Sequence, residues 1–395
     1  MISRFLLFFS EEIMQQLVFD VPVKVFMGSG SLSRIGRIAA EAGSRAIIIT
    51  GTNVLDSGIP ARVEMLLQSA GITSIIFSNI GPHTTAEAVD QACRLSSSGR
   101  AQMVVGVGGV KTLSIARAVS ILASSNMRAA DYIDGLRPEA EALPLFSVMT
   151  ACRDPFAFVD SMMLIDGRSR SCRLCGCEGY FADAVFIEPE LASTIPSSTF
   201  KFSLMENFMY AVEGYMSDSC NYLSENLFLK AISAVVTSDY LLSEDGDDPE
   251  AYEKAAKAGL VTGLGLSMAG PGLGAALAMV IAARFRVPRV LAAAVVLPLS
   301  LEHSLKFNPE KVARLAPIIQ EDAAGLDAVA AAERVIDRIR HRIGVSRVQV
   351  RLSEFGITAD DLAGIAEDVR KFDFLAQFPA PLSVESLVQL LRKAL

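Results

Sequence analysis

The first 150 residues alternate short β-rich runs with helical ones, and this alternation limits the fold to few architectures. Between the β-rich runs, apolar residues recur at helical spacing, which indicates amphipathic helices. Strands that alternate with helices predict a parallel sheet covered by helices on both faces. The expected strands are 46–50, 73–77, 102–106 and 145–149, and the expected helices are 59–70, 86–95 and 112–123.

The character of the chain changes after about residue 190, where strand signals become rare. Apolar runs within 158–187 flank residues 167–179, which predicts a β-hairpin with a long polar tip. We therefore expect an N-terminal extension over 1–17, an α/β domain of the dinucleotide-binding type that includes the hairpin over 18–188, and an all-helical domain over 189–395. The expected helices of the last part are 203–217, 222–242, 249–268, 274–285 and 326–343.

Charge and cysteine content indicate the kind of partner and compartment. The formal net charge of −8 argues against a nucleic-acid partner, because phosphate binding needs clustered Lys and Arg. Six scattered cysteines in a chain of 395 residues fit reduced thiols in a cytoplasm. We expect a cytoplasmic protein that acts on a small-molecule substrate, and its high hydropathy suits the interface of a homodimer.

Two apolar stretches were weighed as targeting or membrane segments. Residues 5–9 are apolar, but Glu11 and Glu12 follow at once, so an extension or short helix is the better interpretation. Neither half of the stretch 259–301 gives a clean span of about 20 apolar residues, so buried helices are expected and no membrane partner. The residues that interrupt this stretch are Arg284, Arg286, Pro288 and Arg289.

Residues 104–118 (VVGVGGVKTLSIARA) place a strand, a glycine turn and a helix in succession. Such a turn exposes backbone N–H groups at a helix N-terminus, where a phosphate can bind. Gly106, Gly108 and Gly109 allow a ligand to approach the backbone closely. From these residues alone, phosphate binding and a plain strand-to-helix turn are equally good interpretations.

This loop resembles the G-G-G-S-x-x-D-x-A-K loop of the iron-type (group III) alcohol dehydrogenase family, and further segments match that family in the right order. The resemblance extends from about residue 18 to the end of the chain. It implies the dehydroquinate synthase-like fold of that family, with an α/β dinucleotide-binding domain that contains a parallel sheet, followed by an all-helical C-terminal domain. The further matching segments are 26–36 (FMGSGSLSRIG), 144–166, 189–217, 287–298 (VPRVLAAAVVLP) and 378–395.

Members of that family hold a divalent metal with one Asp and three His, and the metal polarises the alcohol oxygen. The resemblance places these ligands at Glu206, Tyr210, Ala275 and Arg289, and a further His beside the substrate at Met279. Tyr210 would bind a metal only as a phenolate, Ala275 has no donor, and Arg289 brings a permanent positive charge. We therefore predict no metal, with Arg289 paired to Glu206 in the metal's place.

The cofactor positions of the family have changed as well. Lys111 stands for the loop's Ser and favours retained binding, whereas Val110 stands for its third Gly and favours loss. Arg153 either binds phosphate or plugs the groove with Asp154 as its partner. Gly51 replaces the acidic residue that usually contacts the ribose, which permits NADP as well as NAD. The candidate cofactor-binding residues are Gly106, Gly108, Gly109, Lys111 and Thr150.

The histidines and a cysteine group offer no clear substitute for the lost ligands. Each histidine is interpreted as a surface or helix-end residue. The cysteines are spaced to hold a soft metal with a fourth ligand, but free thiols on the exposed hairpin tip are the simpler interpretation. The residues concerned are His83, His303 and His341, and Cys172, Cys175 and Cys177.

Two functions remain in competition. The first is an NAD(P)-dependent oxidoreductase that acts on a small alcohol or carbonyl without the usual metal. Its catalytic candidates are Tyr210 and Glu206 for proton transfer and Arg289 for binding an acidic substrate or a carbonyl oxygen. The second is a pseudoenzyme that serves as a binding or assembly subunit without redox activity.

Overall fold

The computed structural model describes residues 19–81, 85–177, 179–244, 248–345, 351–378 and 382–395. The extension 1–17 and His83 lie outside them. A six-stranded parallel sheet has the order β1-β8-β5-β4-β2-β3. All four strands expected from the sequence are present, and two further short strands come from 24–27, at one edge, and from 184–187, between β1 and β5. The strands are β1 (Lys24–Met27), β2 (Arg45–Thr50), β3 (Thr73–Phe77), β4 (Met103–Gly108), β5 (Leu145–Met149) and β8 (Ala184–Ile187).

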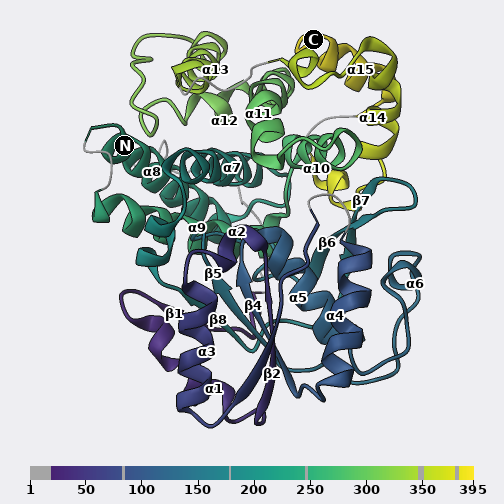
Figure 1. The fold of residues 1–395 in the computed structure, drawn as a ribbon. Coiled ribbons are helices and arrows are strands. Elements are labelled where there is room, and N and C mark those ends of the chain that lie inside the picture. The colour runs from purple at the N-terminus through teal and green to yellow at the C-terminus, as the bar shows by residue number, and fades with distance from the viewer. Residues whose placement is uncertain (1–18, 82–84, 178, 245–247, 346–350, 379–381) are drawn as a thin grey trace, which may run out of the picture.

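Helices cover both faces of the sheet, as the alternating sequence predicted (Figure 1). Along β2, Ile47 and Ile49 pack into one apolar cluster, and Ala46 and Ile48 into another on the opposite face. A strand buried on both faces explains why this run is apolar without alternation. One face carries α1 (Ile35–Ala39) and α3 (Ile59–Ser69), and the other carries α4 (Ala86–Ser98) and α5 (Val110–Leu122).

The second half of the chain is helical and lies beyond the carboxyl ends of the parallel strands (Figure 1). The helices expected from the sequence are all present. Within the described residues no single helix is long and apolar enough to cross a membrane; α9 and α10 meet the length and composition test only as a pair, which is bent by 103°. The helices are α7 (Ser197–Met216), α8 (Tyr222–Glu244), α9 (Pro249–Ala269), α10 (Leu273–Phe285), α11 (Arg289–Leu305), α12 (Pro309–Ala313), α13 (Ala328–Val345), α14 (Leu362–Val369) and α15 (Val384–Arg392).

The hairpin between the halves has a much shorter tip than the sequence suggested. Strands β6 (Ser161–Asp166) and β7 (Ser171–Gly176) pair so that Asp166 faces Ser171, which leaves a four-residue loop. The expected tip over 167–179 was wrong because small polar residues and cysteines can line a buried strand, and here β7 packs against α10.

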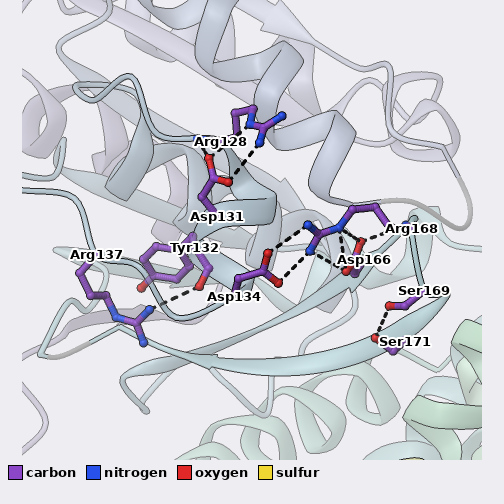
Figure 2. Close-up of polar contacts among 9 residues, drawn as sticks. All are labelled: Arg128, Asp131, Tyr132, Asp134, Arg137, Asp166, Arg168, Ser169 and Ser171. Carbon is purple, nitrogen blue, oxygen red and sulfur yellow. Dashed lines mark hydrogen bonds and ion pairs between the residues drawn. The ribbon is translucent and has the colours of Figure 1, made fainter.

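Arg168 links this loop to the α/β half through ion pairs. Arg168 makes ion pairs with Asp166 at the end of β6 and with Asp134, which follows α6 (Ala129–Ile133) (Figure 2). Its guanidinium contacts both oxygens of each carboxylate at 2.8–3.1 Å. Such planar bidentate contacts fix geometry as well as charge, so the loop is held in a defined position.

Candidate active site at the junction of the two halves

The candidate site lies where the loops after the parallel strands meet the helical half. Glu206 and Tyr210 are one turn apart on α7, and Arg289 is the first residue of α11. Arg153 reaches them from the loop after β5. The structure therefore brings together the three catalytic candidates predicted from the sequence and adds Arg153 as a fourth residue.

Glu206 is fully buried, and both of its carboxylate oxygens contact arginines. Arg289 Nε lies 2.7 Å from one oxygen, and an Nη atom of Arg153 forms an ion pair with the other. The predicted pair between Arg289 and Glu206 is confirmed. This arrangement places two guanidinium groups around one carboxylate, where the family places a cation among four ligands.

Asp154, which one interpretation of the sequence made the partner of Arg153, is not the residue with which it pairs. The partner of Arg153 is Glu206, and Ser203 Oγ lies 3.3 Å from the same Nη atom. The reason is the tight packing of its loop on α9. A Cβ atom at Gly259 would lie 1.8 Å from the carbonyl oxygen of Cys152, so only glycine lets the helix and this loop approach.

Tyr210 contacts the same cluster. Its hydroxyl lies 3.4 Å from Arg289 Nη1, and its side chain is only 1% exposed. Burial raises the pKa of Tyr210, because a phenolate is poorly solvated there, and the charge of Arg289 only partly opposes this effect. Tyr210 is therefore a neutral phenol near pH 7, able to donate a proton but poor at accepting one.

The pKa values of the two arginines shift in opposite directions, although burial acts to lower both. Burial lowers the pKa of Arg153, and the charge of Glu206 only partly opposes this shift. For Arg289 burial also acts to lower the pKa, but Glu206 and other neighbours outweigh it, so the pKa is raised. Arg289 is thus the better stabilised cation of the two.

This set of residues does not fit a divalent ion. Glu206 has both oxygens engaged by cations, Tyr210 is neutral, and Ala275 offers only a methyl group. In the described ranges no three His, Cys, Asp or Glu residues gather in a way that could hold a metal. A cation placed here would meet two guanidinium charges in a site with little solvent to screen them.

A buried acid that sequence reasoning missed organises the start of α10. Glu213 accepts hydrogen bonds from the backbone N–H groups of Gly274 and Ala275 and from Ser300 Oγ. Burial raises the pKa of Glu213, and these three donors act against that shift. The sequence does contain a signal for Glu213, because positions 206, 210 and 213 lie on one face of the same helix.

The glycine loop forms the turn that the sequence predicted, between β4 and α5. Gly109 precedes the first turn of α5, and a Cβ atom there would meet nothing within 4 Å. The outer side of this helix N-terminus is therefore open to a ligand. Val110 is only 4% exposed and packs into the core, so its side chain does not obstruct the loop as one interpretation proposed.

The remaining cofactor candidates lie around this turn. Gly106 packs against α5, since a Cβ atom there would lie 2.8 Å from that of Ala116. The backbone N–H of Thr150 donates to the carbonyl oxygen of Gly108 at 3.1 Å. Lys111 Nζ donates to Gly81 O at 3.1 Å, and burial lowers the pKa of this amine. A glycine turn at a helix N-terminus, with a lysine beside it, fits the phosphates of a dinucleotide.

The histidines stay outside this cluster in the described residues. His341 is exposed on α13, as expected. His303 does lie near the end of α11, but it is only 6% exposed and packs between Phe307 and Phe378. His303 is therefore a helix-end residue, as the sequence predicted, but it is buried because two aromatic rings cover its imidazole.

The cysteine group does not form an exposed tip. Cys172 and Cys175 lie in β7 and Cys177 follows it, and all three are buried free thiols. Burial raises the pKa of Cys172 and Cys175 to about 12 and that of Cys177 to about 11. The thiolate is the reactive and metal-binding form, so these residues are poor ligands and poor nucleophiles at neutral pH.

We expect Cys172, Cys175 and Cys177 to resist alkylation in the native protein. A short treatment with iodoacetamide at pH 8, read by peptide mass spectrometry, should leave all three unmodified, because few thiolates form and the strand is covered. The same treatment in denaturant should modify them fully and serves as the control. Rapid native labelling of Cys175 or Cys177 would show that the hairpin opens.

Comparison with known proteins gives matches along almost the whole chain. The model of the family described as "Iron-containing alcohol dehydrogenase" matches residues 22–184, and that of the "Fe-containing alcohol dehydrogenase family, C-terminal" matches residues 202–395. Lactaldehyde reductase of Escherichia coli K12 is 22% identical over 356 residues, which cover 89% of this chain and 92% of that protein. NAD-dependent methanol dehydrogenase of Bacillus methanolicus is 21% identical over 384 residues, covering 95% and 99%.

Solved structures show the same fold. A 1,3-propanediol oxidoreductase superposes with a TM-score of 0.89 at 22% identity, covering 96% of this chain and all of that one. Sulfoacetaldehyde reductase from Bifidobacterium kashiwanohense, solved with NAD+, gives a TM-score of 0.82 at 19% identity, covering 96% and 99%. At this level of identity the likeness establishes the fold, and chemistry must be argued from the site.

Proposed function

This chain belongs to the iron-containing alcohol dehydrogenase family, and we propose that it is a nicotinamide-dependent oxidoreductase that works on a small carbonyl or alcohol without the family's divalent ion. The observation that carries the proposal is the contact of Tyr210 with Arg289, which is itself paired to Glu206 where the metal would lie. A fixed positive charge beside a neutral phenol supports metal-free polarisation of a carbonyl oxygen.

The site's own residues favour carbonyl reduction over alcohol oxidation. Bound NADH or NADPH would supply the hydride to the carbonyl carbon. Tyr210 would donate the proton that the carbonyl oxygen needs, and Arg289 would stabilise the negative charge that develops there. Oxidation would require Tyr210 to act as a base, and its raised pKa opposes that role. Glu206 is the weaker proton-transfer candidate, because both of its oxygens contact arginines.

The nucleotide would be held at the turn between β4 and α5. The backbone at Gly108 and Gly109 would face the phosphates, Gly106 lets α5 pack closely on β4, Lys111 would add charge, and Thr150 lies beside the same turn. The open space at Gly109 supports this assignment. Gly51 leaves no acidic residue for the ribose, which is compatible with NADP as well as NAD.

A nucleotide titration paired with metal analysis tests the proposal. We expect NADH or NADPH to raise the melting temperature, because a ligand at about 100 times its Kd stabilises the native state by about 2.7 kcal/mol. Purified protein should contain no stoichiometric iron or zinc, and EDTA should leave its melting temperature unchanged. Stoichiometric metal held after dialysis would contradict the metal-free site.

Gly109→Val provides the matched variant for that titration. Gly109 has an extended backbone conformation and free space around its Cβ position, so valine should fold normally without nucleotide. Its side chain would occupy the side of the helix N-terminus that faces the ligand. The nucleotide-induced shift should disappear in this variant, and an unchanged shift would place the nucleotide elsewhere.

A second candidate function is a pseudoenzyme that acts as a binding or assembly subunit. The observation that favours it is the burial of Glu206 and Tyr210, which are 0% and 1% exposed. The absence of a thermal shift with both NADH and NADPH would select this alternative. Three further proposals come from the sequence: a homodimer, a cytoplasmic location and a small-molecule substrate. Measuring the size of the protein in solution tests the homodimer.

A further inference from the structure

A two-chambered cleft lies between the β6–β7 hairpin and the C-terminal helices. The outer chamber has a volume of about 480 Å³ and the inner one about 220 Å³. Arg173 and Lys371 line both chambers, so the two are neighbours that share a wall. Cys172, Leu174, Phe372 and Phe374 give the inner chamber an apolar part, beside the charged side chains of Arg173, Lys371 and Asp373.

The outer chamber carries a positive charge. Four cationic side chains and two carboxylates line it, which gives a net charge of +2; they are Arg170, Arg173, Arg284 and Lys371, and Asp361 and Asp368. Asp368 lies 2.7 Å from Arg284 and 2.6 Å from Lys371, so it pairs with both. Within the described part of the chain, the side chains of Arg170 and Arg173 make no hydrogen bond or ion pair, so two guanidinium groups remain available to an anion.

The loop that carries Arg170 is fixed in place before any ligand binds. Arg170 has a φ of 53°, in the left-handed region that costs energy for a residue with a side chain. Arg168 holds the loop through Asp134 and Asp166, and the hydroxyls of Ser169 and Ser171 lie 2.7 Å apart (Figure 2). Because this loop is already ordered, anion binding loses less free energy to ordering it than binding to a mobile loop would.

The inner chamber approaches the candidate active site. The hairpin that forms its wall contacts that site directly, because Arg289 Nη1 lies 3.5 Å from Met163 Sδ in β6. Phe374 of the same wall lies 3.8 Å from the Cβ position of Gly270, at the end of α9 and just ahead of α10. Met163 is paired across the hairpin with Leu174 of the inner chamber, so the chamber and the Arg289 and Tyr210 cluster lie on neighbouring parts of the same hairpin.

We propose that this cleft selects carbonyl compounds that carry a carboxylate or similar anionic group on an apolar body. The anion binds Arg173 and Arg170, the body packs against Phe372 and Phe374, and the carbonyl end points toward Arg289. The inference rests on the proposed function for its carbonyl end only. The cationic chamber itself is an anion site whatever happens at the other end.

The test compares 4-formylbenzoate with its neutral isostere 4-formylbenzamide, each titrated by calorimetry into the full chain with and without NADPH. We expect the anion to bind at least about tenfold more tightly. Arg173→Gln should weaken the anion about ten- to hundredfold, because a hydrogen bond between charged groups is lost, and should barely affect the amide. Arg37→Gln, an exposed arginine on α1, is the matched control and should change neither.

The outcomes separate this inference from the proposed function. Equal affinities for acid and amide, or a preference that survives Arg173→Gln, would overturn the anion site. Anion binding in a protein that shows no response to NADH or NADPH would keep the site and remove the oxidoreductase. Nucleotide binding without a preference for the anion would keep the oxidoreductase and remove the anion site. Circular dichroism of each variant shows that it is folded, whether or not nucleotide binds.

Discussion

Glu206→Gln should lower the free energy of unfolding by about 3–5 kcal/mol, the range expected when one partner of a buried ion pair is removed. Arg153 and Arg289 would then be two buried cations without a carboxylate between them. Equilibrium unfolding in urea, followed by circular dichroism, measures the loss. Combining the change with Arg289→Met should recover part of it, because one of the two uncompensated charges is removed as well.

Glu253→Gln is the matched control for this prediction. Glu253 pairs with Lys257 on the exposed surface of α9, so its loss should cause no measurable change. If Glu206→Gln were equally harmless, the buried cluster would not be the replacement for the metal that we describe. If the double variant were less stable than the single one, the two arginines would not repel each other significantly.

Glu213→Ala should cost about 3 kcal/mol or more, for a different reason. Three buried donors, the N–H groups of Gly274 and Ala275 and the hydroxyl of Ser300, would lose their acceptor. An unsatisfied buried donor costs roughly 1–3 kcal/mol. Urea unfolding gives the total, and hydrogen exchange should show faster exchange of the Gly274 and Ala275 amides.

Ser300→Ala is the graded control for Glu213. It removes one donor and leaves the acceptor with two, so its effect should be smaller, about 1 kcal/mol. Equal effects of the two variants would mean that the backbone of α10 does not depend on the carboxyl group. Unchanged exchange at Gly274 and Ala275 in Glu213→Ala would lead to the same conclusion.

The sequence predicted the fold well because the signals for it are local. Residues 46–49 are apolar without alternation, which favours a strand buried on both faces, and β2 confirms this. The hairpin tip was placed wrongly because the pairing of Asp166 with Ser171 depends on contacts with α10 that no short window of sequence reveals. Buried thiols on β7 follow from the same tertiary packing.

The site was predictable only in part. The pair between Glu206 and Arg289 followed from charge, because the family resemblance placed an acid and a base at neighbouring positions. The pairing of Arg153 with Glu206 could not be predicted from charge in the same way. It depends on how closely Gly259 lets α9 approach the loop after β5. Glu213 was overlooked because its partners are mainly backbone groups, which carry no sequence signal.

The Arg153–Glu206 contact joins the two halves of the molecule through an ion pair that contains no histidine. Metal centres built from histidine release their ion when the imidazoles take up protons, so their two lobes loosen in acid. A guanidinium keeps its charge at every pH at which proteins remain folded. Neither a chelator nor the protonation of a histidine can therefore open this contact.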